Sequence, residues 1–205
     1  MNDNRIKKLT PLKETKFLSL YDAEYKNKNG KEQHWIISSR KCYSTLNEQF
    51  FQGKEGIVDA VIIVALHKES NKLVLIKQFR VPLNDYVYEL PAGLLDDNEK
   101  IENAVVRELR EETGLSLVEI NYEKTKDKVF LSVGMTDESV ALVYCTCEGV
   151  TSNQYLEEDE DIEVILVSQT QAKELLKTNV KMDIKLFMIL TSFAESGEKL
   201  FNTTV

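Results

Sequence analysis

The chain has 205 residues, 42% of them hydrophobic, which is enough for one sizeable domain with an extension. Its 26 basic and 34 acidic residues give a net charge of −8, and no basic patch with interleaved aromatic residues is visible, so we expect no nucleic-acid partner. No apolar run approaches the roughly 20 residues that cross a bilayer, and the first residues lack the apolar stretch of a secretory signal. These features argue against a membrane protein and predict a soluble, cytoplasmic one.

The first predicted elements are strands. β-rich runs at residues 17–25 and 33–40 flank Asn27-Lys28-Asn29-Gly30, where Asn-Gly supplies the positive φ angles of a hairpin turn. Three further β-rich runs follow, at residues 58–66, 73–79 and 86–90. We therefore expect an N-terminal hairpin, a second hairpin and a short strand.

A long helix is predicted next. Residues 98–113 contain no Gly or Pro and carry apolar side chains among many charges, which is typical of an amphipathic helix. Asn98 is expected to be the N-cap, and Gly114 stands where a left-handed residue would end the helix.

Three carboxylates share one face of this helix, because Glu108, Glu111 and Glu112 are three and four residues apart. An acidic run on a helix is usually a solvated face. Here it follows an expected tight turn at residues 91–93, and the repulsion would disappear if a hard cation lay among the oxygens. Mg²⁺ takes such oxygen ligands and shares them with substrate phosphates, so the pattern indicates a metal site for a phosphate compound.

The remaining elements complete a mixed α/β pattern. Strands are predicted at residues 128–131, 139–147 and 162–167, and helices at residues 170–177 and 182–194. Their order along the chain predicts a mixed sheet with helices packed on its faces.

Three cysteines leave at least one thiol unpaired in any disulfide scheme within the chain. Cys145 and Cys147 are two residues apart in a predicted strand, which places both on one face of a sheet. We interpret them as reduced packing residues, with a redox or metal pair as the alternative. With only His34 and His67, the chain has little material for a zinc site or a serine-histidine triad.

Nine positions between Gly93 and Leu115 form one pattern in the sequence GLLDDNEKIENAVVRELREETGL. This pattern is the Nudix box: Gly, five residues, Glu, seven residues, then Arg-Glu-apolar-x-Glu-Glu-x-Gly-apolar. The chain thus resembles Nudix hydrolases, which use divalent metal to cleave a diphosphate attached to a nucleoside. The resemblance implies a Nudix α/β/α sandwich with a mixed sheet at residues 51–205. It also implies an N-terminal β-hairpin extension at residues 1–50, which serves dimerisation and the nucleotide pocket.

The metal site implied by the resemblance lies in the box and in a second acidic segment. Two or three Mg²⁺ ions are expected, with Mn²⁺ as an alternative. Glu108 and Glu112 are the expected direct ligands, the carbonyl of Ala92 completes the metal shell, and Glu160 is a ligand or a helper. Three further residues are expected to shape the box: Gly93, Glu99 and Gly114.

Arg107 is close enough in sequence to hold a box carboxylate by a charge-assisted hydrogen bond, and the resemblance gives it that role. Glu99 either assists from the helix start or is favoured there by the helix dipole. We name the acidic cluster at residues 157–161 the acidic loop. Residues 158–162 resemble a mobile loop that closes over the diphosphate and supplies the general base; the alternative is a solvated turn. Glu158 is the first choice as base and Glu111 competes, because a loop carboxylate can reach the water when substrate is bound.

Four other segments resemble the ADP-ribose pyrophosphatase branch of the family: residues 34–40, 77–80, 89–93 and 131–138. The residues that the resemblance places at the substrate are Trp35, Arg40, Arg80, Glu89 and Glu138. Trp35 is expected to stack on adenine, with a dimer interface or a core position as the alternative. Two positions depart from the branch, since Ile36 stands where an acid is common and Val133 replaces the proline associated with ADP-ribose specificity.

The resemblance implies hydrolysis of a nucleoside diphosphate sugar, with ADP-ribose cleaved to AMP and ribose 5-phosphate as the first choice. GDP-mannose or another nucleoside diphosphate sugar is the alternative within the branch. An ADP-ribose sensor that binds without cleaving, and a structural interaction protein, are alternatives of other classes. A homodimer is also implied, in which the N-terminal hairpin of one subunit helps to build its partner's nucleotide pocket.

Overall fold

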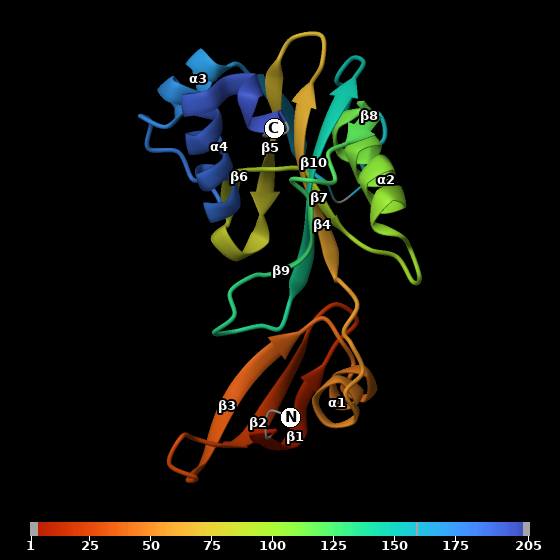
Figure 1. Ribbon diagram of the computed structural model, residues 1–205, viewed down its shortest axis with the longest axis vertical. Helices are drawn as coiled ribbons and strands as arrows, with labels where there is room; N and C mark the ends of the chain where they lie inside the picture. The colour runs from red at the N-terminus through yellow and green to blue at the C-terminus, as the bar shows by residue number, and fades with distance from the viewer. Residues whose placement is uncertain (1–3, 159, 203–205) are drawn as a thin grey trace. The chain divides into compact units, whose positions relative to one another are not determined.

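The computed structural model describes residues 4–158 and 160–202, and the chain divides into two compact units (Figure 1). The first unit contains the residues up to Asp59 and Lys128–Val140, and the second contains Ala60–Asp127 and the residues from Ala141 onward. The division after residue 50, which the family resemblance implies, stays a prediction.

The first unit contains a three-stranded antiparallel sheet and one helix. The elements are β1 (Ile6–Glu14), β2 (Ser19–Lys26), β3 (Glu32–Ser39) and α1 (Tyr43–Gln52). In the turn between β2 and β3, the Asn27 side chain accepts a 2.9 Å hydrogen bond from the N–H of Asn29, and Gly30 has a φ of 76°. This hairpin confirms the sequence prediction, whereas β1 and α1 were not predicted. The core of the unit is formed by Leu9, Tyr21, Ala23 and Leu46.

An eight-stranded sheet frames the second unit, with β11, β5, β4, β10 and β8 in that order, β6 beside β5, β7 beside β4 and β9 beside β10. The strands are β4 (Ala60–His67), β5 (Lys72–Arg80), β6 (Asp85–Glu89), β7 (Ala92–Leu94), β8 (Ser116–Ile120), β9 (Lys126–Phe130), β10 (Ser139–Glu148) and β11 (Ile162–Val167). β5 is antiparallel to both β4 and β11. β4 runs parallel to β10. The N–H of Asp59, just before β4, donates to the carbonyl of Ser139, and the N–H of Lys68, just after β4, donates to the carbonyl of Cys147, so both strands advance in the same direction. The sheet is therefore mixed, as predicted.

Helices cover both faces of this sheet (Figure 1). α2 (Ile101–Thr113) lies on one face, and α3 (Gln169–Leu175) and α4 (Ile184–Ser196) lie on the other. Two 3₁₀ turns are also present, at Val81–Leu83 and Gly197–Phe201. All eight residues of β4 are buried, as expected for a strand between two helical layers. The predicted α/β/α sandwich is thus confirmed.

The box helix starts later than the sequence suggested. It begins at Ile101, and Asn98 has a φ of 62°, which is not the extended conformation of an N-cap. Its end agrees with the prediction, because Gly114 has a φ of 74° and donates to the carbonyl of Arg110. A tight turn was expected at residues 91–93, but Ala92 and Gly93 instead begin β7, which pairs with β4.

Cys145 and Cys147 are buried in β10, and Cys42, Cys145 and Cys147 are all free thiols. Burial raises the pKa of Cys147 to about 12, so this thiol stays protonated, as predicted for a packing residue. Within residues 4–158 and 160–202, no helix is long and apolar enough to cross a membrane.

Candidate active site

Two carboxylates of α2 lie directly against β7. The N–H of Ala92 donates a 2.9 Å hydrogen bond to Oε2 of Glu112. A Cβ atom built on Gly93 would overlap the carboxyl group of Glu108, so only glycine allows this close approach. The strand therefore brings both predicted metal ligands beside Ala92, as the sequence suggested.

These two carboxylates are buried, with 7% of Glu108 and 3% of Glu112 exposed. Burial raises the pKa of both, and that of Glu112 well above its ordinary value, although the hydrogen bond from Ala92 opposes the effect. Glu160 raises both values further, because like charges disfavour ionisation. Two buried, adjacent carboxylates are therefore costly to ionise unless a cation joins them.

Arg107 connects the carboxylates of the box. Its Nε and Nη2 atoms donate to Glu99 at 3.0 and 2.8 Å, and its Nη1 atom donates to Glu108 at 2.6 Å and to Glu111 at 3.1 Å. A further bond of 2.9 Å reaches the carbonyl of Leu94. The bonds to Glu99 are the largest cause of the raised pKa of Arg107, and they lower the pKa of Glu99.

Glu99 lies beside the start of α2 and accepts hydrogen bonds from Arg107, so both interpretations of this residue, assistance in the box and a favourable helix dipole, stay predictions. Arg107 thus has the geometry of a residue that orients carboxylates. Its role in catalysis, like that of Glu111, stays a prediction.

Arg80 and Glu89 form a second charged pair, on the neighbouring strands β5 and β6. The pair is bidentate, with distances of 2.7 and 2.8 Å between guanidinium nitrogens and carboxylate oxygens. The hydrogen bonds to Glu89 are the main cause of the raised pKa of Arg80, and the charges of Glu112 and Glu160 add to it. Arg80 therefore shares one electrostatic environment with the box carboxylates.

The acidic loop is partly fixed by its own hydrogen bonds. Oε2 of Glu160 accepts from the N–H of Glu157 at 2.9 Å, and Glu158 is exposed. In the described part of the chain, no three Asp, Glu, His or Cys side chains are already gathered as a metal cluster. The metal role of Glu160 and the base role of Glu158 stay predictions.

Predicted substrate residues of the first unit also lie together. The indole Nε1 of Trp35 donates to the carbonyl of Gly134 at 3.1 Å, and Arg40 forms an ion pair with Glu138. The segment at residues 131–138 is held against β3, because Ser38 donates to the carbonyl of Met135. Trp35 is 52% exposed, so the alternative of a core position is wrong. Two segments about 100 residues apart in sequence thus lie side by side and form one surface.

A buried ion cluster beside this surface was missed from the sequence. Nζ of Lys41 lies 2.7 Å from a carboxylate oxygen of Asp59 and 3.0 Å from one of Asp137. Burial alone would lower the pKa of Lys41, but the hydrogen bonds to Asp59 and Asp137 raise it. The cluster fixes the residues adjacent to Arg40 and Glu138. No signal in the sequence indicates which acids Lys41 meets.

The sandwich and its carboxylate-bearing helix define an α/β protein with an acidic site suited to phosphate chemistry. Residues 56–187 match the model of the NUDIX domain. The chain therefore belongs to the Nudix family.

Individual relatives agree with this assignment. The ADP-ribose pyrophosphatase of Saccharomyces cerevisiae is 34% identical over 173 residues, which are 80% of this chain and 71% of that protein. A Caenorhabditis elegans protein named as a nudix hydrolase is 39% identical over 123 residues, which are 57% of this chain and only 54% of that protein. Other relatives include GDP-mannose pyrophosphatases of Enterobacter and Citrobacter. The crystal structure of an ADP compounds hydrolase has the same fold, with a TM-score of 0.65 at 16% identity, covering 96% of this chain and all of that one.

Proposed function

We propose that the protein is a metal-dependent pyrophosphatase that hydrolyses the diphosphate linkage of nucleoside diphosphate sugars. ADP-ribose is the first choice of substrate, with AMP and ribose 5-phosphate as products. The observation that carries the proposal is the pair of buried carboxylates, Glu108 and Glu112, held against β7 by Gly93 and Ala92. The relatives named as ADP-ribose pyrophosphatases support the substrate class.

The residues of the site fit a divalent cation. Glu108 and Glu112 offer hard oxygen donors, and burial raises the pKa of both carboxyl groups, so a bound cation would favour their ionised forms. Oxygen donors favour Mg²⁺, with Mn²⁺ as an alternative. We infer that Glu108, Glu112 and the carbonyl of Ala92 hold the ion and that Glu160 assists. Bound there, the metal would polarise the phosphorus centre and lower the pKa of the attacking water.

The other residues would orient and stabilise the reacting groups. Arg107 fixes the Glu108 carboxylate through a 2.6 Å hydrogen bond. Arg80 would contact the phosphate oxygens, and Glu89 fixes its guanidinium in a bidentate pair. For the base we prefer Glu158 to Glu111, because Arg107 already engages Glu111 whereas Glu158 is exposed.

Substrate selection is proposed for the surface that β3 and residues 131–138 form in the first unit. The exposed indole of Trp35 offers a stacking platform for a base, and the pair of Arg40 and Glu138 offers polar contacts to a sugar. GDP-mannose is the second candidate, because Val133 replaces a proline, Ile36 replaces an acid, and GDP-mannose pyrophosphatases are among the relatives.

Turnover across a panel of nucleoside diphosphate compounds tests the function. With Mg²⁺ we expect ADP-ribose to yield AMP and ribose 5-phosphate, and we expect EDTA or Glu112→Gln to reduce kcat by at least about 100-fold. Faster cleavage of GDP-mannose would transfer the assignment to the second candidate. Tight binding of ADP-ribose without any product would instead favour the sensor.

Three further properties are part of the proposal. We place the protein in the cytoplasm, because a reducing compartment keeps thiols such as Cys42, Cys145 and Cys147 free. A homodimer is proposed, and its test is argued in the Discussion. Nucleic acid is not expected to bind, because the net charge of −8 would repel it.

A further inference from the structure

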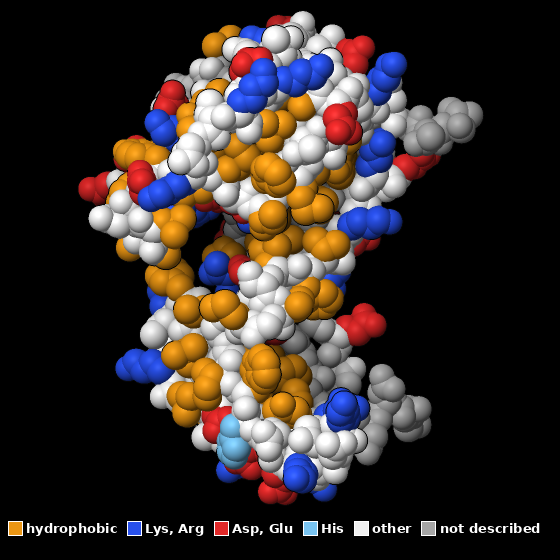
Figure 2. Space-filling view, turned by 90° about the vertical axis from the view of Figure 1, so that its left-hand side faces the viewer, with side chains coloured by type: hydrophobic (Ala, Val, Ile, Leu, Met, Phe, Trp, Pro, Cys, Tyr) orange, Lys and Arg blue, Asp and Glu red, His pale blue; other side chains and the backbone are white. Residues whose placement is uncertain are grey.

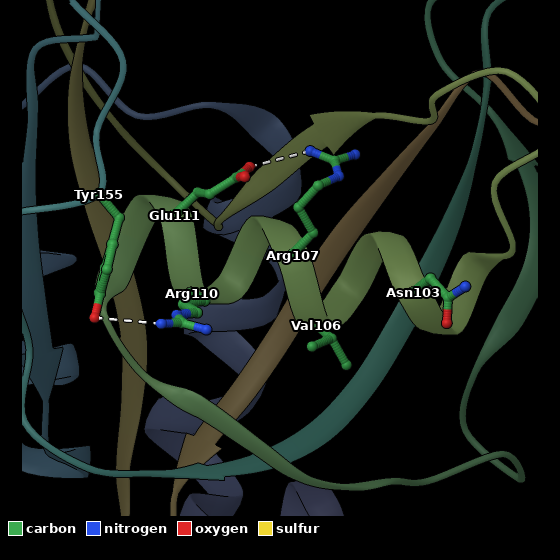
Figure 3. A pocket seen from close by; sticks show the side chains of 6 residues that line it. All are labelled: Asn103, Val106, Arg107, Arg110, Glu111 and Tyr155. Carbon is green, nitrogen blue, oxygen red and sulfur yellow. Dashed lines mark hydrogen bonds and ion pairs between the residues drawn. The ribbon is translucent and has the colours of Figure 1, made fainter.

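Arg110 and Tyr155 pack together on the outward face of α2 (Figure 3). The guanidinium of Arg110 lies 4.8 Å from the centre of the Tyr155 ring, and its Nη2 atom donates to the tyrosine hydroxyl at 3.4 Å. The two residues border a cavity of about 530 Å³, whose other lining residues are Asn103, Val106, Arg107 and Glu111. Arg110 occupies a position that the box pattern leaves unspecified, so the box itself does not explain this pair.

Tyr155 lies two residues before the acidic loop. The residues just before Tyr155 are hydrogen-bonded to other parts of the second unit. The N–H of Ser152 donates to the carbonyl of Thr113 at the end of α2, at 3.0 Å. The side chain of Asn153 donates to the carbonyl of Ile162 at 3.2 Å. A hydrogen bond therefore joins Asn153 to Ile162, one on each side of the acidic loop.

The far side of the acidic loop is attached to β5 and β6. The N–H of Phe79 donates to the carbonyl of Asp161 at 3.1 Å, and the hydroxyl of Tyr86 donates to the Asp161 carboxylate. Between this attachment and Tyr155 lies Glu160. Its Oε2 atom accepts from the N–H of Glu157 at 2.9 Å, and this bond joins Glu160 to the near side of the loop without attaching that side to α2.

We propose that the Arg110–Tyr155 pair is the anchor of this near side, which positions Glu158 and Glu160 toward the box carboxylates. Stacking of a guanidinium on an aromatic face is a directional contact, and here it joins the box helix to the loop that follows it. Arg110 and Tyr155 are positioning residues, because neither would touch the reacting atoms. The catalytic part of this inference rests on the proposed hydrolase function, whereas the attachment of the loop does not.

Cleavage by a glutamyl endopeptidase reports the attachment without any substrate. Glu157 and Glu158 are exposed, and a loop released from α2 should reach the protease more often. In metal-free protein, we expect Tyr155→Ala to be cut after Glu157 or Glu158 about fivefold faster than the wild type. Tyr155→Phe keeps the stacked ring and should stay within about twofold. Tyr122→Ala removes another exposed tyrosine of the same unit and should leave the rate of cleavage after Glu157 or Glu158 unchanged.

Steady-state kinetics test the consequence for the reaction. Tyr155→Ala should lower kcat about fivefold and leave KM within about twofold, because the loop supplies the proposed base and not the main substrate contacts. The kcat of the double variant Arg110→Gln/Tyr155→Ala should be no lower than that of either single variant, because each single variant already removes the contact between the two residues.

Equal cleavage of Tyr155→Ala and wild type would overturn the anchor, and so would independent, multiplying losses in the double variant. If the wild type cleaves no nucleoside diphosphate compound, the proposed function fails, and the protease experiment still decides whether the pair anchors the loop.

Discussion

At the scale of single residues, burial disfavours the ionised form of Glu112 in the metal-free protein. Burial raises its pKa well above the ordinary value of 4.5, and the charges of Glu108 and Glu160 raise it further. A carboxyl group whose folded pKa is raised stabilises the protein fully below the unfolded pKa. That stability is lost as the pH rises through the folded pKa.

The variant Glu112→Gln should therefore be more stable than the wild type in the absence of metal. Above pH 6 we expect a gain of about 1 to 2 kcal/mol, which disappears near pH 4. Glutamine retains an oxygen that can accept the hydrogen bond from Ala92. Urea unfolding in EDTA at several pH values measures the effect. Glu111→Gln is the control and should gain no stability, because Arg107 already pairs with this partly exposed carboxylate. If Glu112→Gln is less stable than the wild type at pH 8, the argument is contradicted.

Gly93 gives a second prediction at the same scale. Because a Cβ atom there would overlap the carboxyl group of Glu108, Gly93→Ala should displace this proposed ligand. We expect the Kd for Mn²⁺, measured by calorimetry, to rise at least about tenfold. Gly134→Ala is the matched control, since a Cβ at Gly134 meets no atom within 4 Å. Unchanged Mn²⁺ affinity in Gly93→Ala would show that Glu108 is not a ligand of the metal.

At the scale of elements, the sequence predicted what local patterns encode. The hairpin between β2 and β3 was predicted because Asn29-Gly30 is a turn dipeptide, and Gly30 does adopt a positive φ. The end of α2 was predicted because Gly114 can adopt a positive φ. The start of α2 was misplaced because its N-cap, Lys100, makes no capping bond with its side chain. β1 was missed because its residues show no clear alternation. α1 was missed because its N-cap, Cys42, makes no capping bond with its side chain, although Gly53 ends the helix with a φ of 69°; tertiary packing stabilises both elements.

The Lys41 cluster is a contact between elements that no local pattern could predict. It joins the residue after β3 to Asp59 and Asp137, which lie 18 and 96 positions away. Because all three side chains are largely buried, Lys41→Met would leave two carboxylates without their cation. We expect a loss of about 3 kcal/mol in the free energy of unfolding, measured with urea at pH 7.

The matched control for this cluster is Lys54→Met. Lys54 also pairs with a carboxylate, that of Glu48, at 2.7 Å, but its side chain is 61% exposed. We expect this variant to lose less than about 0.5 kcal/mol, because solvent screens exposed pairs. Similar losses in Lys41→Met and Lys54→Met would show that burial does not strengthen the first pair.

At the scale of the whole molecule, the sequence identified the family and most of the candidate site, because the box is a contiguous pattern. Sequence spacing indicated that Glu108 and Glu112 share a helix face, and the structure adds that β7 packs against both. The contact of Trp35 with Gly134 spans 99 positions, and the resemblance could suggest the two segments but not their contact. The loop attachment through Arg110 and Tyr155 was not predicted, since neither residue belongs to a motif.

The predicted homodimer is the last property at this scale. Hydrophobic side chains are exposed in the first unit (Figure 2), including Leu12, Phe17, Leu18 and Leu20. Exposed apolar surface of this kind often marks a protein interface. We expect light scattering to give twice the chain mass of 23.5 kDa at micromolar concentration. A monomer with full activity would refute the dimer.

A surface variant can locate that interface. Phe17 is 63% exposed in the turn between β1 and β2, so Phe17→Ser should leave the fold of the subunit unchanged. Because serine removes apolar area that the partner would cover, we expect dissociation at concentrations at least about tenfold higher than for the wild type. Val150→Ser, at an exposed apolar residue of the second unit, serves as the control and should remain dimeric. If Phe17→Ser dissociates no more readily than Val150→Ser, the N-terminal sheet is not the contact between subunits, and the proposed pocket must be complete within one chain.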